Sequence, residues 1–376
     1  MKKILFISNI ADSKIGSFSM ASIIASNKSG MEFHIAANFS AESIEQRKID
    51  EEKYNIKIHH IDFIRNPMDF RNFIAYRQLI ELIKKEKFDM IHCNTPIGGV
   101  CGRIAGKNCN VKKVIYQAHG FHFYKGAPKK NWFLYYPIEK WLAKYTDVLI
   151  TITKEDYELA QTRFKLRNDG TIYYVPGVGV DNTIYNVNES IRLRKRKELG
   201  IPLGAYVLVS VGELNKNKNN QVVISAIAQM KNHSIHYVLC GNGELKEYLQ
   251  NLADAKGIRD NVHILGYRED VKDILKMSDC LIMPSYREGL SRAIMEAMAS
   301  GLPVACSRIR GNVDLIDESL GGTLFDCDNI DDVTKAIYRM MSFDHKKMGN
   351  YNLEKVKEYS LDSISQKIYN IYVKEM

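Results

Sequence analysis

The chain has 376 residues, of which 45% are hydrophobic and 26% are charged, and its formal net charge is +9. This length is too great for one ordinary core and suits two domains, and the composition excludes disordered and collagen-like classes. No apolar run approaches the roughly 20 residues that a membrane-spanning helix requires.

Short β-branched segments alternate with helix-length segments in the first half of the chain. The pattern predicts strands at residues 3–7, 33–37, 90–93, 113–117 and 148–152, and helices at 70–85, 99–107, 132–144 and 154–164. We interpret the first strand as a buried one and not as a targeting segment, because the sequence becomes polar by Asn9. This alternation predicts a parallel sheet covered on both faces.

The positive charge is concentrated between Arg103 and Tyr145, where nine basic residues accompany one acid, Glu139. The same segment is rich in Trp, Tyr and Phe. Lysine mixed with these rings suits an anionic membrane surface, where charges meet headgroups and rings lie at the boundary. A solvated basic face around a buried aromatic core fits equally well. Nucleic-acid binding is the least favoured alternative, because no recognised motif accompanies the charge.

A second series of elements follows, with strands expected at residues 206–211, 236–240, 262–265, 280–283 and 303–306 and helices at 219–230, 244–255, 290–300 and 331–341. A Pro- and Gly-containing segment at 175–181 separates the two series. We therefore expect an N-terminal Rossmann-like domain at 1–180 on the acceptor side and a second at 181–358 on the donor side, facing a central cleft. A final helix at 359–376 should pack back on the first domain. The basic run 192–197 is expected to be the solvated face of a linking helix.

The seven cysteines are odd in number and form no C-x-x-C motif. Most lie in apolar stretches, which predicts reduced, buried thiols in a cytoplasmic protein rather than disulfides or zinc ligands. The basic aromatic stretch adds the inner face of the cell membrane to the expected location.

The strongest chemical signal is the segment from Pro284 to Val304. A strand ends at Pro284, a glycine loop follows, and a helix is predicted to start near Leu290. The free N–H groups and positive dipole end of such a helix favour a diphosphate. Glu288 precedes this helix and Glu296 lies about two turns into it. One carboxylate can therefore accept from a transferred sugar and the other from a ribose diol.

This segment resembles the E-x₇-E signature of family 4 retaining glycosyltransferases of the GT-B fold, a family with many capsule and exopolysaccharide enzymes. Residues 210–219 resemble the family's phosphate loop, 91–96 and 118–123 resemble its N-terminal landmarks, and 175–181 resemble its hinge. The resemblance implies an α/β fold of two Rossmann-like domains, and it spans nearly the whole chain.

The resemblance also implies roles for individual residues. Glu288 should contact the donor sugar, Lys218 should neutralise charge on the departing diphosphate, and His119 should lie near both. Glu296 should hold the ribose. The further donor-binding residues that we expect are Gly16, Gly212, Asn217, Gly241, Arg287, Gly289, Leu290 and Ser291. The acceptor or membrane side is expected to include His122, Lys129, Lys130 and Trp132.

Two departures from the family pattern affect the donor site. Glu213 stands where the family usually has arginine, and we hypothesise that Arg287 or Arg292 supplies the missing charge. Only Gly16 is found where many members have a Gly-Gly pair. The Asp326-Cys327-Asp328 sequence matches a metal motif of another fold, but its position favours a capped loop, and no metal or cofactor is expected.

The expected activity is retaining transfer of a sugar from a nucleoside-diphosphate donor to a polysaccharide or lipid-linked acceptor. The family resemblance implies a UDP-sugar as the donor, such as a UDP-hexose or UDP-N-acetylhexosamine. A UDP-N-acetylglucosamine 2-epimerase-like enzyme of the same fold is the alternative. A non-catalytic lectin-like protein is a third class, and the presence of Glu288, Glu296, Lys218 and His119 argues against it.

Overall fold

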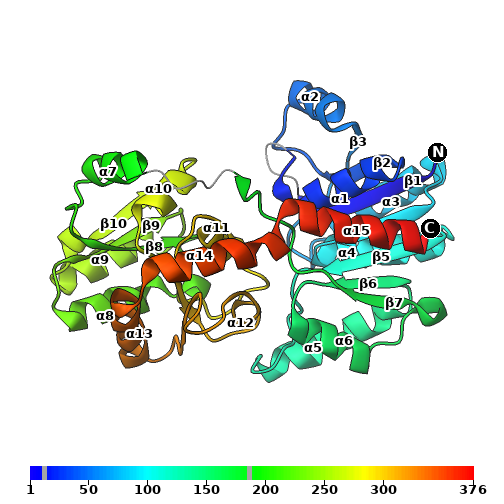
Figure 1. The fold of residues 1–376 in the computed structure, drawn as a ribbon. Coiled ribbons are helices and arrows are strands. Elements are labelled where there is room, and N and C mark those ends of the chain that lie inside the picture. Colours follow the sequence, from blue (N-terminus) through cyan, green and yellow to red (C-terminus); the bar gives the residue numbers. More distant parts are fainter. Residues whose placement is uncertain (11–14, 184–188) are drawn as a thin grey trace. The chain divides into compact units, whose positions relative to one another are not determined.

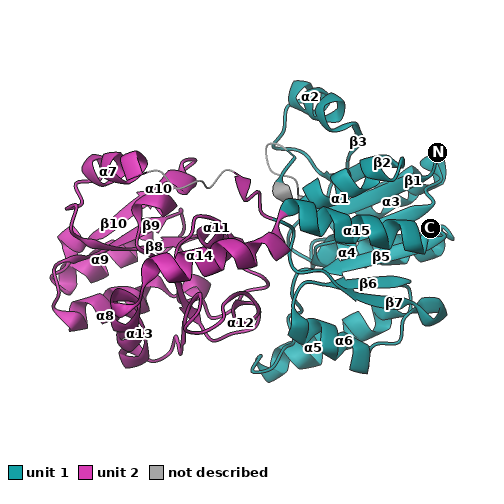
Figure 2. Ribbon diagram, viewed as in Figure 1, with its two compact units in different colours: residues 1–179, 361–376 teal, residues 180–360 magenta. Residues whose placement is uncertain are grey.

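The computed structural model describes residues 1–10, 15–183 and 189–376. It divides the chain into two compact units, shown in Figure 2. Unit 1 consists of residues 1–179 and 361–376, and unit 2 consists of residues 180–360. Each unit is built on a parallel sheet, so the predicted fold class of two Rossmann-like α/β domains is confirmed.

Unit 1 contains a seven-stranded sheet in the order β3-β2-β1-β4-β5-β6-β7 (Figure 1). The strands are β1 (Lys3–Ile10), β2 (Glu32–Asn38), β3 (Ile56–His60), β4 (Met90–Asn94), β5 (Lys113–Ala118), β6 (Val148–Thr151) and β7 (Thr171–Tyr174). Successive β1 side chains alternate between the faces: Ile4 and Phe6 enter one core, and Leu5 and Ile7 enter the other.

Helices cover both faces of this sheet. The helices are α1 (Ser17–Lys28), α2 (Ile44–Tyr54), α3 (Arg71–Glu86), α4 (Pro96–Asn108), α5 (Lys129–Ala143), α6 (Lys154–Arg163), the short η1 (Arg167–Asp169) and α15 (Leu361–Glu375). Buried residues of α3 and α4 join one core, and those of α1 and α15 join the other. The C-terminal helix α15 packs along α1 (Figure 1).

Unit 2 contains a six-stranded sheet in the order β10-β9-β8-β11-β12-β13. Its strands are β8 (Tyr206–Val211), β9 (Ile235–Cys240), β10 (Val262–Gly266), β11 (Cys280–Met283), β12 (Val304–Ser307) and β13 (Gly322–Phe325). Its helices are α7 (Glu189–Glu198), α8 (Asn220–Met230), α9 (Lys246–Ala255), α10 (Val271–Met277), α11 (Arg292–Ala299), α12 (Asn312–Leu315), α13 (Ile330–Ser342) and α14 (His345–Lys355), with the short helices η3 (Lys216–Lys218), η4 (Arg259–Asn261) and η5 (Val356–Tyr359).

An aspartate directly precedes each of three strands, β4, β6 and β11, and joins that strand to a neighbouring one. Asp89, Asp147 and Asp279 each accept a hydrogen bond from the first residues of the adjacent strand, through Lys3 N, Val114 N and Val207 N at 2.7–2.9 Å. The Asp backbone N–H returns a bond to the carbonyl of the same residue. These paired contacts satisfy amides at the amino ends of the sheets, where the ladder begins.

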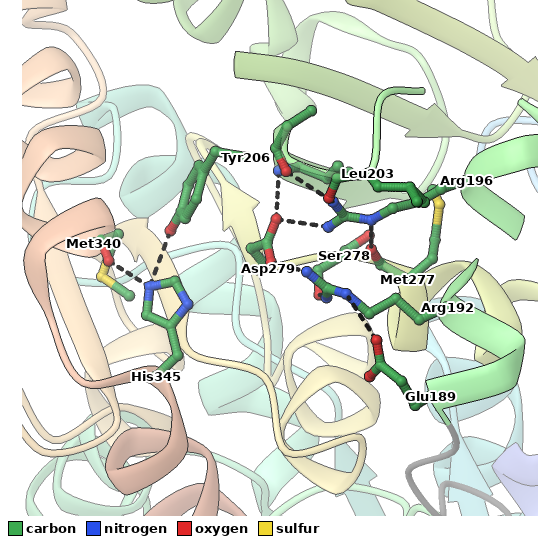
Figure 3. Close-up of polar contacts among 12 residues, drawn as sticks. Glu189, Arg192, Arg196, Leu203, Tyr206, Met277, Ser278, Asp279, Met340 and His345 are labelled. Atoms are coloured by element: carbon green, nitrogen blue, oxygen red, sulfur yellow. Dashed lines mark hydrogen bonds and ion pairs between the residues drawn. The ribbon is translucent and has the colours of Figure 1, made fainter. Parts of the chain in front are cut away.

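Arg196 is buried, contrary to the expectation that the run 192–197 is a solvated face, and Arg103 is buried as well. Arg196 is 1% exposed and donates to Asp279 and to the carbonyls of Met277, Leu203 and Ala205 (Figure 3). Arg103 is similarly buried and pairs with Glu139 at 2.8 Å. The partner carboxylates lie far along the chain, and they offset the cost of burying the guanidinium groups.

The seven cysteines are free thiols, and six of them are buried. Burial raises the pKa of every one of these thiols, so none is poised as a thiolate. Within the part of the chain that the structure describes, no helix is both long and apolar enough to cross a bilayer.

Candidate active site

The loop between β11 and α11 carries the two carboxylates of the E-x₇-E segment. Ser291 is the N-cap of α11, and its Oγ accepts from the Ile294 N–H at 3.4 Å. The helix therefore begins at Arg292, two residues later than predicted, and leaves Gly289 and Leu290 in the loop. This end of α11 presents its first amides beyond the carboxyl ends of the strands, where parallel sheets bind ligands.

Lys218 and Glu288 form an ion pair in unit 2. The Lys218 Nζ lies 2.7 Å from Glu288 Oε1, and both side chains are largely buried. Lys218 ends η3, after β8, whereas Glu288 follows β11, which pairs directly with β8. The sheet thus brings together two side chains that are 70 residues apart. The ammonium group is held beside the carboxylate in a partly desolvated setting, where charge interactions are strong.

The loops that carry this pair are joined by two hydrogen bonds. Tyr286 N–H donates to the Asn217 carbonyl at 2.8 Å, and the Asn217 side chain donates to the Arg287 carbonyl at 2.9 Å. Asn217 therefore links the two loops. The Arg287 side chain is exposed to solvent.

Glu296 lies on α11 and accepts from Arg292 Nε at 2.7 Å. Arg292 is thus engaged with this carboxylate, one turn earlier on the same helix. Glu213, at the departure from the family pattern, is exposed and accepts from Asn215 Nδ2 at 2.9 Å within its own loop. The hypothesis that Arg287 or Arg292 supplies the charge of the missing arginine stays a prediction.

Gly212 and Gly241 follow β8 and β9 and contact each other closely. Both have positive φ, +148° and +149°. A Cβ on Gly241 would lie 1.9 Å from the Gly212 carbonyl oxygen, and one on Gly212 would lie 2.9 Å from Lys218 Cε. Glycine is required at both positions because the backbones and the lysine stem occupy that space. A small pocket beside them is lined by Gly212, Lys218 and Met283, among others.

Arg310 is a cation of this region that the sequence analysis did not select. It is nearly buried, and its Nη2 lies 3.4 Å from the Glu288 carbonyl oxygen. The next residue, Gly311, lies so close to Gly289 that a Cβ would overlap the Gly289 carbonyl oxygen. No motif in residues 308–311 indicates that they lie close to residues 288 and 289, because this proximity depends on the path of the loop that follows β12.

In unit 1, His119 follows β5 and Asn94 ends the neighbouring strand β4. His119 Nε2 lies 2.9 Å from Asn94 Oδ1, and the Phe18 ring lies 4.1 Å from the imidazole, centroid to centroid. Burial lowers the pKa of His119 to about 3, so its imidazole is neutral near pH 7. The next residue after Asn94, Thr95, has φ 62° and ψ 156°, a region almost confined to glycine and typical of functional sites.

The remaining predicted residues lie elsewhere in unit 1. Gly16 is the exposed N-cap residue of α1, and residues 11–14 of the same loop lie outside the described residues. The His122 ring lies 4.6 Å from that of Tyr135. Lys129 and Lys130 are exposed at the start of α5. Trp132 faces inward: it packs on Phe123 and donates its indole N–H to the Tyr124 carbonyl.

Two parallel-sheet Rossmann-like units, with an E-x₇-E segment at the end of one sheet, define a GT-B glycosyltransferase. The chain belongs to the family 4-like glycosyltransferases: residues 191–355 match the family described as Glycosyl transferases group 1, and residues 3–153 match Glycosyl transferase 4-like. The sequence-based family assignment and the prediction of a transferase enzyme are thereby confirmed.

Individual relatives agree with this assignment. The chain is 36% identical over 330 residues to EpsD of Bacillus subtilis, which carries a glycosyltransferase name, covering 86% of this chain and 83% of EpsD. It is 31% identical over 278 residues, 72% of this chain and 70% of the relative, to an Escherichia coli UDP-Gal:alpha-D-GlcNAc-diphosphoundecaprenol alpha-1,3-galactosyltransferase. The fold is similar to that of Anabaena HepE, solved with UDP and glucose, at a TM-score of 0.78 and 18% identity over the full length of both chains.

Proposed function

We propose that this chain is a retaining glycosyltransferase that moves a hexose or N-acetylhexosamine from a UDP-sugar to a saccharide carried on a polyprenyl diphosphate, in surface polysaccharide assembly at the inner face of the cell membrane. The observation that carries the proposal is the 2.7 Å pair between Lys218 and Glu288 beside the start of α11. A cation, a carboxylate and helix amides together suit a sugar diphosphate.

The donor is held by unit 2 in this proposal. The α11 amides and Lys218 contact the diphosphate, Glu288 accepts from the sugar, and Glu296, oriented by Arg292, accepts from the ribose. As the anomeric carbon separates from the diphosphate oxygen, negative charge grows on that oxygen, and Lys218 stabilises it. Charge growth makes the lysine contact stronger in the transition state than in the bound donor, which is the requirement for catalysis.

Retention follows from displacement on a single face of the sugar. The acceptor hydroxyl bonds to the anomeric carbon on the side from which the diphosphate departs, and its proton passes to the departing diphosphate oxygen. No covalent sugar–enzyme intermediate is formed, and the neutral His119 contributes hydrogen bonding rather than a second positive charge.

UDP and a lipid-linked acceptor are supported by the relatives. The name of the Escherichia coli relative specifies UDP-Gal and a diphosphoundecaprenol-linked acceptor, and Anabaena HepE was solved with UDP. These descriptions belong to those proteins, and they select the donors and acceptors that should be tried first.

A donor panel tests the proposal. Thermal shift with UDP-, GDP- and dTDP-sugars should show stabilisation by UDP-sugars, and transfer to a polyprenyl-diphosphate-linked N-acetylglucosamine should give a product whose anomer, read by NMR, matches the donor. Glu288→Gln serves as the inactive control. Failure to consume any UDP-sugar with lipid-linked acceptors would refute it. Conversion of UDP-N-acetylglucosamine to a new sugar nucleotide without acceptor would instead identify an epimerase.

A further inference from the structure

Helix α5 exposes an apolar face on unit 1. Phe133 is 87% exposed and Trp141 is 47% exposed, and Leu134 and Ile138 are also exposed. The four residues stand at positions 133, 134, 138 and 141. In a helix with 3.6 residues per turn, these positions place the side chains on one side. These four large exposed apolar side chains lie within nine residues of α5, and such an apolar stripe is unusual on a surface that contacts only water.

The opposite side of α5 is firmly fixed to unit 1. Trp132 and Tyr136 pack around Phe123, and Leu142 is fully buried. Glu139 accepts from the buried Arg103 at 2.8 Å, which joins α5 to α4. The orientation of the helix is therefore set by its inner face, and the exposed stripe is not an accident of a loosely held segment.

Lysines flank the stripe at both ends of the helix. Lys129 and Lys130 are exposed at its start, Lys140 and Lys144 are exposed at its end, and Lys125 is exposed in the preceding loop. Glu139 is the one acid in residues 119–146 of the sequence, and its carboxylate is committed to Arg103. The exposed side of this segment thus carries positive charge without a counterbalancing carboxylate of its own.

We propose that this face of α5, consisting of Phe133, Leu134, Ile138 and Trp141 with the five lysines, docks on an anionic lipid bilayer. The apolar and aromatic side chains enter the headgroup boundary while the lysines contact lipid phosphates. The proposal rests on the proposed function in that a lipid-linked acceptor is presented at such a surface.

The charge pattern favours a bilayer over a second copy of the chain. In a twofold dimer the same patch meets itself, so the lysines of one α5 would lie near the lysines of the other. Such like-charge contacts are unfavourable, whereas an anionic bilayer complements all five lysines at once.

Sedimentation with lipid vesicles tests the docking without donor or acceptor. The full chain should bind vesicles containing phosphatidylglycerol and leave neutral phosphatidylcholine vesicles unbound. Lys129→Glu/Lys130→Glu should weaken binding by roughly fivefold or more per lysine, and Phe133→Ser/Trp141→Ser should weaken it by at least about tenfold.

Matched variants separate α5 from general surface effects. Lys346→Glu/Lys347→Glu changes an adjacent exposed lysine pair on α14, and Tyr248→Ser/Tyr267→Ser removes exposed aromatics of unit 2; both should bind vesicles as the unmodified chain does. The proposal is overturned if the unmodified chain ignores anionic vesicles, if α5 and control variants bind alike, or if size-exclusion shows a dimer that the α5 variants dissociate. Unfolding midpoints of all variants check folding, and vesicle binding is independent of whether any UDP-sugar is turned over.

Discussion

His119 and Asn94 form a hydrogen bond of 2.9 Å between Nε2 and Oδ1 at the ends of adjacent strands. An amide oxygen can only accept, so His119 Nε2 carries the proton and Nδ1 is left as an acceptor. Because burial lowers the pKa of His119 to about 3, the imidazole stays neutral across the physiological range. Asn94 is 0% exposed, and its Nδ2 has no hydrogen-bond partner among the described residues.

Asn94→Asp should introduce an acidic limb into the pH dependence of transfer. A carboxylate 2.9 Å from the ring favours the imidazolium form and should raise the pKa of His119 by about 1–3 units. In the unmodified enzyme the ring is neutral above about pH 4. In the variant, protonation of the ring should reduce the transfer rate below about pH 6. Transfer rates between pH 4.5 and 8 measure this. Asn94→Leu removes the bond without adding charge and should lower the rate with no new limb. Identical profiles for Asn94→Asp and Asn94→Leu would contradict the role.

Lys218→Met should lower kcat by about 10²- to 10³-fold, because it removes a cation expected to act on developing charge. The matched control is Lys216→Met, two residues earlier in η3, where the lysine is exposed. Steady-state turnover of the preferred UDP-sugar should leave the control within twofold of the unmodified enzyme. A fall of less than tenfold for Lys218→Met would remove this lysine from the mechanism.

Arg292→Ala should raise KM for the donor about tenfold with a smaller change in kcat, because the Glu296 carboxylate loses a charged hydrogen-bond partner at 2.7 Å. Arg308→Ala is a fair comparison: Arg308 is similarly exposed and also pairs with a glutamate, Glu318. Initial rates over a range of donor concentrations distinguish the two variants. Equal KM values would show that Arg292 does not orient Glu296, the carboxylate proposed to bind the ribose.

Asp279→Asn should destabilise unit 2 by about 3 kcal/mol, because it leaves the buried Arg196 guanidinium without a counter-ion while preserving side-chain volume. Asp273→Asn should cost less than about 1 kcal/mol, since its partner Arg194 is mostly exposed and 3.3 Å away. Urea-induced unfolding of the two variants gives the free-energy difference. Similar losses of unfolding free energy for both variants would indicate that the burial of Arg196 does not determine the cost of removing its carboxylate partner.

Local patterns in the sequence were sufficient for the donor end of unit 2. The strand before Pro284, the glycine loop and the helix carrying Glu296 occur within a few residues of one another, so spacing alone placed Glu288 and Glu296 on either side of the start of α11. The phosphate-loop resemblance likewise selected Lys218, and the parallel order of β8 and β11 explains why it lies near Glu288. Their roles in binding and catalysis remain predictions.

Other features depend on contacts between distant residues. The Asn94 partner of His119 is 25 residues away, and the Asp279 partner of Arg196 is 83 residues away. No local pattern reports such pairs, which is why a basic run expected to be solvated contains a buried arginine. Helix α1 was not predicted because its Ser, Ala and Asn residues show no clear apolar period, although α15 packs along it. The remaining unpredicted helices are short or highly polar, as with α2.

The chain enters unit 2 at Val180 and leaves it at Ser360, and these two residues form a β-bridge, with Val180 N–H also donating to the Tyr359 carbonyl at 3.0 Å. Unit 2 is therefore an insertion into unit 1, and the two ends of the insertion are joined by these hydrogen bonds. Replacing residues 180–360 with the equivalent part of a relative requires only two adjacent junctions to match. Chimeras built at this point offer a direct way to exchange the unit proposed to bind the donor while the α1–α15 packing of the host unit stays intact.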